Sequence, residues 1–333
     1  MRIGLIAAVI VASIAPVCAQ GALYKSQTLN LYIGLAAGGG YDSYGRLAAQ
    51  HLSRFIPGTP VIVVQNMPGA GGLKVASYMK SVATRDGSAL AMAAEAMLLE
   101  EVLQSPGVDY KSRDFGWIGR LTESASIFFT YENSAVKNMS DAKNIVSRFG
   151  STGVTGITGY TPRALNSIAG TKFEVVAGYR GSAEVLLAME RGEVDGGFAL
   201  WPEFKTQKPD WLTDKKINIL YIVAPKRSPD LPNVPTTTEL GPDEKSNSVL
   251  RLLASTSEIG RSLFTTPAVS PQQVKLLRHA FDQMVRDASF AEEALKRGLR
   301  IDPLGGSQLQ DVVEGLSDVP EDVVKSARAA RQT

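Results

Sequence analysis

Three consecutive glycines, Gly38 to Gly40, stand between a short apolar segment and a helical pattern, and Tyr41 and Asp42 follow them directly. Glycine tolerates positive φ and lets another molecule approach the main chain closely. The first N–H groups of the expected helix have no partner inside it, and they carry the positive end of its dipole. One helix end contributes only about 0.3–2 kcal/mol to a bound charge, so this loop predicts part of an anion site that needs a facing wall. A glycine turn that merely joins a strand to a helix explains the same residues.

The facing wall is predicted in a second stretch, residues 151–162, which is dense in glycine and hydroxyl side chains. Backbone N–H groups and threonine hydroxyls, such as those of Thr155 and Thr158, can hold a carboxylate or a polar tail of a ligand. A further glycine turn at Gly181 and Ser182 opens another expected helix. The alternative interpretation of residues 151–162 is a polar surface loop.

Residues suited to catalysis or metal binding are sparse. The two histidines, His51 and His279, lie on expected helices without a ligand partner at i+4, and the sequence has no HExxH motif or cysteine cluster. It also lacks GxGxxG, GxxxxGK[ST] and GxSxG motifs. Asp42 and Arg46, spaced i and i+4, are interpreted as an intrahelical ion pair. We therefore predict no catalytic residues, no metal and no cofactor.

Composition and the N-terminus limit the class of protein. The 333 residues are 44% hydrophobic with a net charge of +2, which allows two ordinary domains and shows no basic stripe for nucleic acid. Residues 1–19 have the charge, apolar run and small-residue end of a secretory signal peptide, with cleavage expected after Ala19. Cleavage there removes Cys18, the only cysteine. Lipidation of Cys18 and an uncleaved anchor are the alternatives; in either case the protein is expected to be exported.

Strand and helix patterns alternate along the chain, which predicts parallel sheets with helices on both faces. In such sheets ligands bind beyond the carboxyl ends of the strands, where the glycine turns lie. The β-branched run Val61 to Val64 predicts a strand buried on both faces. Helices are expected, among others, at 140–148, at 163–168 with Pro162 in its first turn, and at 309–331.

Several short motifs follow one another along nearly the whole chain after the leader. They are Gly38-Gly39-Gly40-Tyr41-Asp42 with Arg46, Asn66-Met67-Pro68-Gly69-Ala70-Gly71-Gly72, Asp86-Gly87, Asp114-Phe115, Tyr179-Arg180-Gly181-Ser182-Ala183, Gly192-Glu193-Val194-Asp195 and Leu231-Pro232-Asn233-Val234-Pro235-Thr236. Each motif is weak alone. Their joint order resembles that of the Bug (TctC-like) receptors, the extracytoplasmic solute-binding proteins of tripartite tricarboxylate transporters.

This resemblance implies an α/β fold of the type II periplasmic binding protein class, with two hinged lobes, mostly parallel sheets and a ligand cleft between them. The lobes would comprise residues 26–122 plus 225–333 and residues 123–224. The resemblance also implies a periplasmic, monomeric receptor without catalysis, which captures a small organic carboxylate and delivers it to the permease subunits of a membrane transporter. A receptor of the same fold that acts on a signalling partner is the alternative.

The resemblance also implies which residues bind the ligand. One carboxylate would be held by main-chain N–H groups of the first loop, at Gly39, Gly40, Tyr41 and Asp42. The other lobe would contribute Thr155, Thr158, Gly159 and Tyr160, with Ser182 and Asp195 nearby. Two further ligand-binding candidates come from the sequence itself: Gly181, in the glycine turn before Ser182, and Trp201, just past an expected strand end.

Three aromatic residues suggest a preference among carboxylates. Tyr41 replaces the small residue that is usual in this family before the aspartate. Together with Tyr160 and Trp201 it would wall a pocket that favours an aromatic or longer-chain acid over a citrate-like one. Large aromatic residues at a domain face also serve packing, and that interpretation stays open.

Overall fold

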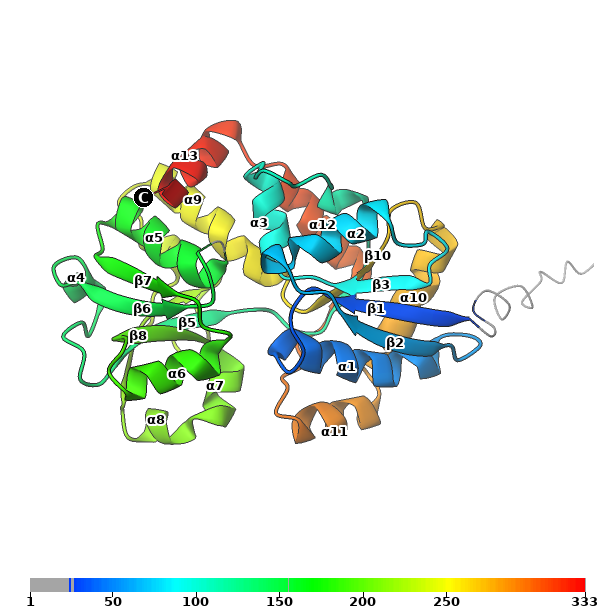
Figure 1. The fold of residues 1–333 in the computed structure, drawn as a ribbon, viewed down its shortest axis with the longest axis horizontal. Coiled ribbons are helices and arrows are strands. Elements are labelled where there is room, and N and C mark those ends of the chain that lie inside the picture. Colours follow the sequence, from blue (N-terminus) through cyan, green and yellow to red (C-terminus); the bar gives the residue numbers. More distant parts are fainter. Residues whose placement is uncertain (1–23, 25–26, 155, 333) are drawn as a thin grey trace, which may run out of the picture.

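The computed structural model describes residues 24, 27–154 and 156–332, which form two α/β halves lying side by side, each built around one β-sheet (Figure 1). The predicted signal peptide and Thr155 lie outside the described residues. The α/β fold with two sheets is as predicted from the sequence.

The first sheet has six strands in the order β11-β4-β10-β3-β1-β2. These strands are β1 (Thr28–Ile33), β2 (Val61–Asn66), β3 (Ala89–Met92), β4 (Gly116–Arg120), β10 (Ser262–Thr265) and β11 (Leu304–Gly305). β1 pairs in parallel with β2 and β3, whereas β10 is antiparallel to β3 and β4, and β11 is antiparallel to β4.

The second sheet has five strands in the order β7-β6-β8-β5-β9. These strands are β5 (Ser126–Tyr131), β6 (Ser147–Ser151), β7 (Phe173–Ala177), β8 (Gly196–Leu200) and β9 (Ile217–Val223). β6 is parallel to β7 and β8, and β5 is antiparallel to β8 and β9.

Both sheets are therefore mixed, rather than mostly parallel as expected, because the chain crosses between them. It leaves the first sheet after β4, enters the second with β5, and returns with β10. β5 and β10 are the first strands after the chain crosses, so each starts at the edge of the sheet that faces the other half. Their neighbours end at that edge, and β5 and β10 are therefore antiparallel to them. Consequently β1 to β4 and β6 to β9 all point their carboxyl ends toward the other half.

Helices cover both faces of each sheet. Those of the first half are α1 (Gly40–Leu52), α2 (Leu73–Ser81), α3 (Ala96–Val102), α10 (Pro271–Met284), α11 (Ala288–Lys296) and α12 (Gly306–Ser317). Those that pack on the second sheet are α4 (Met139–Ala142), α5 (Ile157–Ala169), α6 (Ser182–Glu190), α7 (Trp201–Gln207), α8 (Pro209–Thr213), α9 (Glu244–Ser255) and α13 (Glu321–Gln332).

The strand period of two distributes side chains between the two faces of a sheet. In β1, Leu29, Leu31 and Ile33 pack in the cluster that contains α1 and α10 side chains, whereas Tyr32 packs on the opposite face with those of α2. The same alternation sends Phe128 of β5 to the face covered by α5, α9 and α13. Each sheet is thus the middle layer of a three-layer sandwich.

The long C-terminal part of the chain contributes to both halves. Leu250 and Leu253 of α9 and Ala327 of α13 share one buried cluster with Phe128 and Phe149 of the second sheet. The lobe boundaries 26–122 plus 225–333 and 123–224 remain a prediction, and this packing groups α9 and α13 with the second sheet.

Three sequence expectations about elements are wrong. β2 is the edge of its sheet, so Val61 and Val63 are 66% and 42% exposed instead of buried. The segment expected as helix 140–148 contains only the end of the short α4 and the start of β6. The helix expected at 309–331 is broken, since α12 ends at Ser317 and α13 starts at Glu321, directly after a proline, which cannot continue a helix.

Candidate functional site

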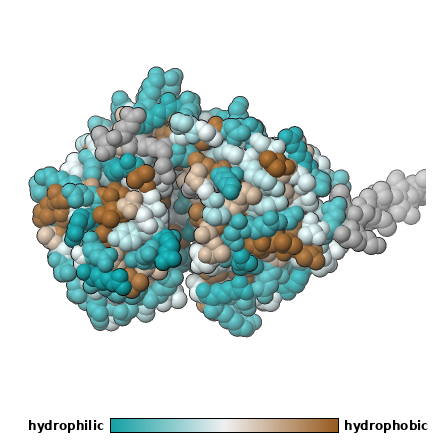
Figure 2. Space-filling model, viewed as in Figure 1, coloured by the Kyte–Doolittle hydropathy of each residue, from teal (hydrophilic) through white to brown (hydrophobic). Residues whose placement is uncertain are grey.

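A cleft separates the two halves where the carboxyl ends of their strands face each other (Figure 2). Helices α1, α5 and α6 begin at this edge, after β1, β6 and β7 respectively. The first N–H groups of a helix have no intrahelical partner, so the fold brings three sets of hydrogen-bond donors to one cleft.

The glycine loop presents free main-chain donors at the start of α1. Gly38 has φ +83°, in the left-handed region that glycine tolerates, and Gly39 is the N-cap residue without a side-chain cap. The amide nitrogens of Gly39, Gly40 and Tyr41 donate no hydrogen bond to any residue that the structure describes. This is the geometry of an anion site at a helix N-terminus.

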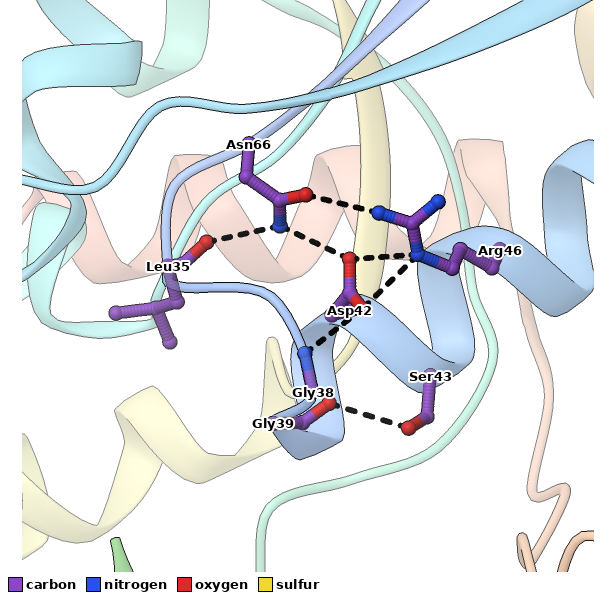
Figure 3. Close-up of polar contacts among 7 residues, drawn as sticks. All are labelled: Leu35, Gly38, Gly39, Asp42, Ser43, Arg46 and Asn66. Carbon is purple, nitrogen blue, oxygen red and sulfur yellow. Dashed lines mark hydrogen bonds and ion pairs between the residues drawn. The ribbon is translucent and has the colours of Figure 1, made fainter. Parts of the chain in front are cut away.

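The carboxylate of Asp42 lies between Gly38, Asn66 and Arg46 and holds this loop in place (Figure 3). Its Oδ2 accepts a 2.9 Å hydrogen bond from the N–H of Gly38, and its Oδ1 accepts one of 2.9 Å from Asn66 Nδ2. Arg46 Nε donates to both carboxylate oxygens, which confirms the predicted i, i+4 pair. Asn66 also donates to the carbonyl of Leu35, so one carboxylate ties β2, the loop and α1 together.

The electrostatics of Asp42 match this structural role. Burial opposes ionisation of the carboxyl, but hydrogen bonds from Arg46, Gly38 and Asn66 outweigh it and lower its pKa below the usual value. The side chain is 7% exposed and bonded to Gly38, Arg46 and Asn66, so its carboxylate holds the loop in place rather than contacting a ligand.

The side chain of Tyr41 turns into the floor of the cleft. Its ring centroid lies 3.8 Å from the guanidinium carbon of Arg261, and its hydroxyl accepts a 3.3 Å hydrogen bond from the N–H of Glu95. Tyr41 is 7% exposed. The ring therefore supports the floor, while the Tyr41 amide stays available to a ligand.

Arg261 stands at the centre of that floor because β10 enters the sheet from the cleft side. It directly precedes β10, and its Nη1 donates a 2.6 Å hydrogen bond to Ser124 Oγ, on the segment between β4 and β5 where the chain first crosses between the halves. Glu95, which follows β3, approaches Arg261 Nη1 with Oε2 at 3.7 Å. The Arg261 side chain is 7% exposed.

Glu203 reaches the same place from the second half. It lies in the first turn of α7, and its Oε1 would be 3.9 Å from a Cβ placed on Gly40, with Arg261 Nη2 at 3.6 Å from the same point. Burial raises the pKa of Glu203, opposed only by the charge of Arg261. The start of α1 is thus faced by a carboxyl group from the other half.

The hydroxyl-rich stretch of the second half leaves β6 after Ser151 and enters α5 at Ile157, six residues before the expected start of the helix. The helix starts at Ile157, so Pro162 lies in its second turn. The Thr158 hydroxyl is within 3.0 Å of the hydroxyls of Ser151 and Thr152 and is thus occupied inside this half. A Cβ on Gly159 would lie 2.2 Å from the carbonyl oxygen of Gly153, so this glycine permits close packing of the turn.

Tyr160 belongs to the hydrophobic core. It is 1% exposed, and its hydroxyl donates a 2.7 Å hydrogen bond to the carbonyl of Ala327 in α13. The side chain therefore points away from the cleft and joins α5 to the C-terminal helix.

Gly181 and Ser182 open α6 at the cleft edge. Gly181 is the N-cap residue, and nothing lies within 4 Å of a Cβ placed on it. Glu184 accepts a 2.6 Å hydrogen bond from the N–H of Arg180. This leaves the start of α6 open toward the cleft.

The last two predicted residues lie at opposite ends of β8. Asp195 precedes the strand, and its carboxylate accepts a 2.7 Å hydrogen bond from the N–H of Arg148, so it is far from the carboxyl ends that form the cleft. Trp201 follows the strand, is 6% exposed, and donates from Nε1 to Asp230 at 3.2 Å. The structure brings Gly39, Gly40 and Tyr41 together with Glu203, but not with Asp195 or the ring of Tyr160.

Trp201 also lines a cavity of about 230 Å³ beside the two crossing segments. Its walls are formed by Glu123, Ala125, Trp201, Ile222, Ala224, Pro225, Lys226, Arg227, Ser228, Pro229, Glu258 and Arg300. Residues 224–229, which directly follow β9, supply half of this wall, and Glu123, Ala125 and Glu258 come from segments where the chain crosses between the halves.

Sequence reasoning missed Glu95, Arg261 and Glu203. The rule that ligands bind beyond the carboxyl ends of strands could have selected Glu95 and Glu203, since each follows an expected strand within three residues. No local signal points to Arg261, because its place depends on the return of the chain from the other half.

No group of three or more histidine, cysteine, aspartate or glutamate side chains in the described part of the chain could hold a metal ion. None of the helices described is both long and apolar enough to cross a membrane.

Comparison with known proteins identifies close similarity to one family. Residues 45–314 match the model of the tripartite tricarboxylate transporter family receptor. A Cupriavidus necator protein named "UPF0065 protein in gbd 5'region" is 28% identical over 291 residues, which cover 84% of this chain and 81% of that protein.

Solved structures share the fold at low sequence identity. MatC from Rhodopseudomonas palustris with bound malate is 20% identical with a TM-score of 0.62, covering 88% of this chain and 98% of that one. A second R. palustris protein, solved with adipate, is 20% identical with a TM-score of 0.65, covering 90% and 97%.

Proposed function

Because the chain belongs to the tripartite tricarboxylate transporter family of receptors, we propose that it is a periplasmic solute-binding receptor for a small organic carboxylate. The ligand binds between the two halves, and the loaded receptor delivers it to the permease subunits of a membrane transporter. The receptor acts as a monomer in this proposal.

The observation that carries the proposal is the set of free amides at Gly39, Gly40 and Tyr41, opposite the starts of α5 and α6. Micromolar affinity requires about 8 kcal/mol, whereas one helix end contributes about 0.3–2 kcal/mol to a charge. A single helix end is therefore too weak, and donors from both halves must contact the ligand. Ligand binding consequently favours the closed arrangement of the halves.

Small dicarboxylates are the first candidates. Relatives of the same fold were solved with malate and with adipate, and both acids have two carboxylates that helix N-termini on opposite sides of a cleft could hold. The buried rings of Tyr41, Tyr160 and Trp201 do not support the aromatic-walled pocket suggested by the sequence, and the proposal does not use one.

A thermal-shift screen of residues 20–333 against malate, adipate, citrate and benzoate tests the proposal. An acid at 100 times its Kd adds about 2.7 kcal/mol to the free energy of unfolding, which corresponds to a shift of several degrees. We expect malate or adipate to give the largest shift. A larger shift with benzoate would restore the aromatic pocket, and no shift with any acid would contradict the proposal.

A further inference from the structure

Three ionisable side chains meet on the floor of the cleft, and the main-chain carboxylate site does not use them. Arg261 and Glu95 come from the first half, and Glu203 comes from α7 of the second. They form what we call the floor cluster, which joins the two halves directly beside Gly40.

The floor cluster is buried but not internally satisfied. Glu95 Oε2, Glu203 Oε1 and Arg261 Nε are all inaccessible to solvent, and none has a hydrogen-bond partner among the described residues. The 3.7 Å between Glu95 Oε2 and Arg261 Nη1 is an ion pair without a hydrogen bond. Buried polar atoms are almost always paired in native proteins, so three unpaired atoms in one place point to a missing component.

The cluster is also short of positive charge. It has two carboxyl groups and one guanidinium, and the guanidinium is shared with the ring of Tyr41 and the hydroxyl of Ser124. Burial raises the pKa of both Glu95 and Glu203, with Arg261 opposing it in each case.

Among the residues that the structure describes, Arg261 is the only charged group that acts on the pKa of Glu95 and Glu203. From α1 the facing titratable group is the phenol of Tyr44, which donates to the carbonyl of Arg300. On α7 itself, Lys205 is paired with Asp230. With every acid ionised, the floor cluster would carry one net negative charge.

That charge lies beside the proposed carboxylate site. A Cβ on Gly40 would lie 3.6 Å from Arg261 Nη2 and 3.9 Å from Glu203 Oε1, and Gly40 supplies one of the three free amides. A ligand carboxylate bound there would face an ionised Glu203 across a few ångströms of protein interior, where like charges repel strongly.

We propose that this receptor takes up a proton together with its carboxylate ligand, and that Glu203 or Glu95 holds the proton. The proton comes from solvent, and it leaves the floor cluster neutral. A protonated Glu203 can then donate a hydrogen bond to a ligand bound beside Gly40, which supplies a partner for its buried carboxyl group. This inference rests on the proposed carboxylate-binding function and adds a specificity-determining pair to it.

Isothermal titration of residues 20–333 tests the proposal between pH 6.5 and 8.5, where malate and adipate are fully ionised. The better-binding acid of the two is titrated in phosphate and in Tris buffer, whose heats of ionisation differ. We expect the affinity for the acid to fall by up to tenfold for each unit that the pH rises. The observed heat of binding should differ between the two buffers, because the buffer releases the proton that the protein takes up.

Variants locate the proton. Glu203→Gln and Glu95→Gln keep the shape of the side chain and remove its charge, and at least one of them should bind the acid more tightly at pH 8.5 and flatten the pH profile. Glu174→Gln, an exposed acid on β7, is the matched control and should behave like the unmodified protein.

The measurements on the unmodified protein test proton uptake even if a variant fails to fold. Affinity that is constant with pH, together with heats that do not depend on the buffer, would overturn the inference and leave the receptor function standing. Absence of binding by folded protein at every pH would contradict both proposals.

Discussion

At the residue scale, the structure assigns Asp42 a positioning role. The spacing of Asp42 and Arg46 predicts their ion pair, which the structure confirms. The sequence did not reveal that the same carboxylate accepts hydrogen bonds from Gly38 and Asn66, because Asn66 is 24 residues away and reaches Asp42 only through the pairing of β1 with β2.

Asp42→Asn is expected to lower the free energy of unfolding by about 1–3 kcal/mol, since it breaks a buried charge-assisted network. It should also weaken carboxylate binding, because Gly38 is released. The lowered pKa of Asp42 means that its contribution to stability is present above its usual pKa and is lost as pH falls through the lower folded value. Denaturant titrations at pH 7 and pH 3 check this; Asp318→Asn, on an exposed acid, should show no comparable loss.

Tyr160→Phe distinguishes a core residue from a ligand contact. Removal of the hydroxyl breaks its hydrogen bond to the carbonyl of Ala327, which costs about 0.5–1.5 kcal/mol of stability, while affinity for the carboxylate should not change. Denaturant unfolding and titration calorimetry measure the two quantities. Reduced affinity with unchanged stability would return Tyr160 to the ligand site.

At the element scale, a local pattern can predict a strand without showing which of its faces is covered. The β-branched run of β2 is a strand as expected, yet its exposure depends on its position at the edge of the sheet, which only the strand order determines. The candidate site likewise combines features that a local pattern predicts with one that only the strand order determines. The glycine loop and α1 are local features, whereas Arg261 arrives with the returning strand β10.

A pair of alanine substitutions tests the assignment of edge and centre. Val63→Ala in β2 removes a side chain that is 42% exposed and should cost less than about 1 kcal/mol. Leu90→Ala in β3, at a fully buried position, should cost about 2–5 kcal/mol. Equal losses in urea unfolding would show that β2 is covered in solution.

At the scale of the whole molecule, the two halves share a buried charge cluster, and this links stability to pH. Burial raises the pKa of Glu95 and Glu203 above the usual 4.5. The folded state therefore holds protons that the unfolded state releases, so this contribution to stability is complete below about pH 4.5 and declines as pH rises through the raised values.

Glu203→Gln should therefore raise the Tm of the ligand-free protein at pH 8 and change it less at pH 4.5, because the neutral amide avoids burial of a charge. Melting curves at both values, with Glu174→Gln as the control, measure this difference. If Glu203→Gln raises the Tm equally at the two pH values, the destabilising effect of Glu203 does not come from its charge.

The most direct test of the account is calorimetric titration of malate and adipate into the unmodified protein, Gly40→Leu and Gly315→Leu. Gly40 lies among the free amides, and a Cβ placed on it would be in van der Waals contact with Arg261 and Glu203. Gly315 is an exposed glycine of α12, and nothing lies within 4 Å of a Cβ placed on it. We expect the unmodified protein and Gly315→Leu to bind malate or adipate. Gly40→Leu should remain folded and lose affinity for the acid by 100-fold or more. Unchanged affinity in folded Gly40→Leu would contradict a carboxylate site at the start of α1.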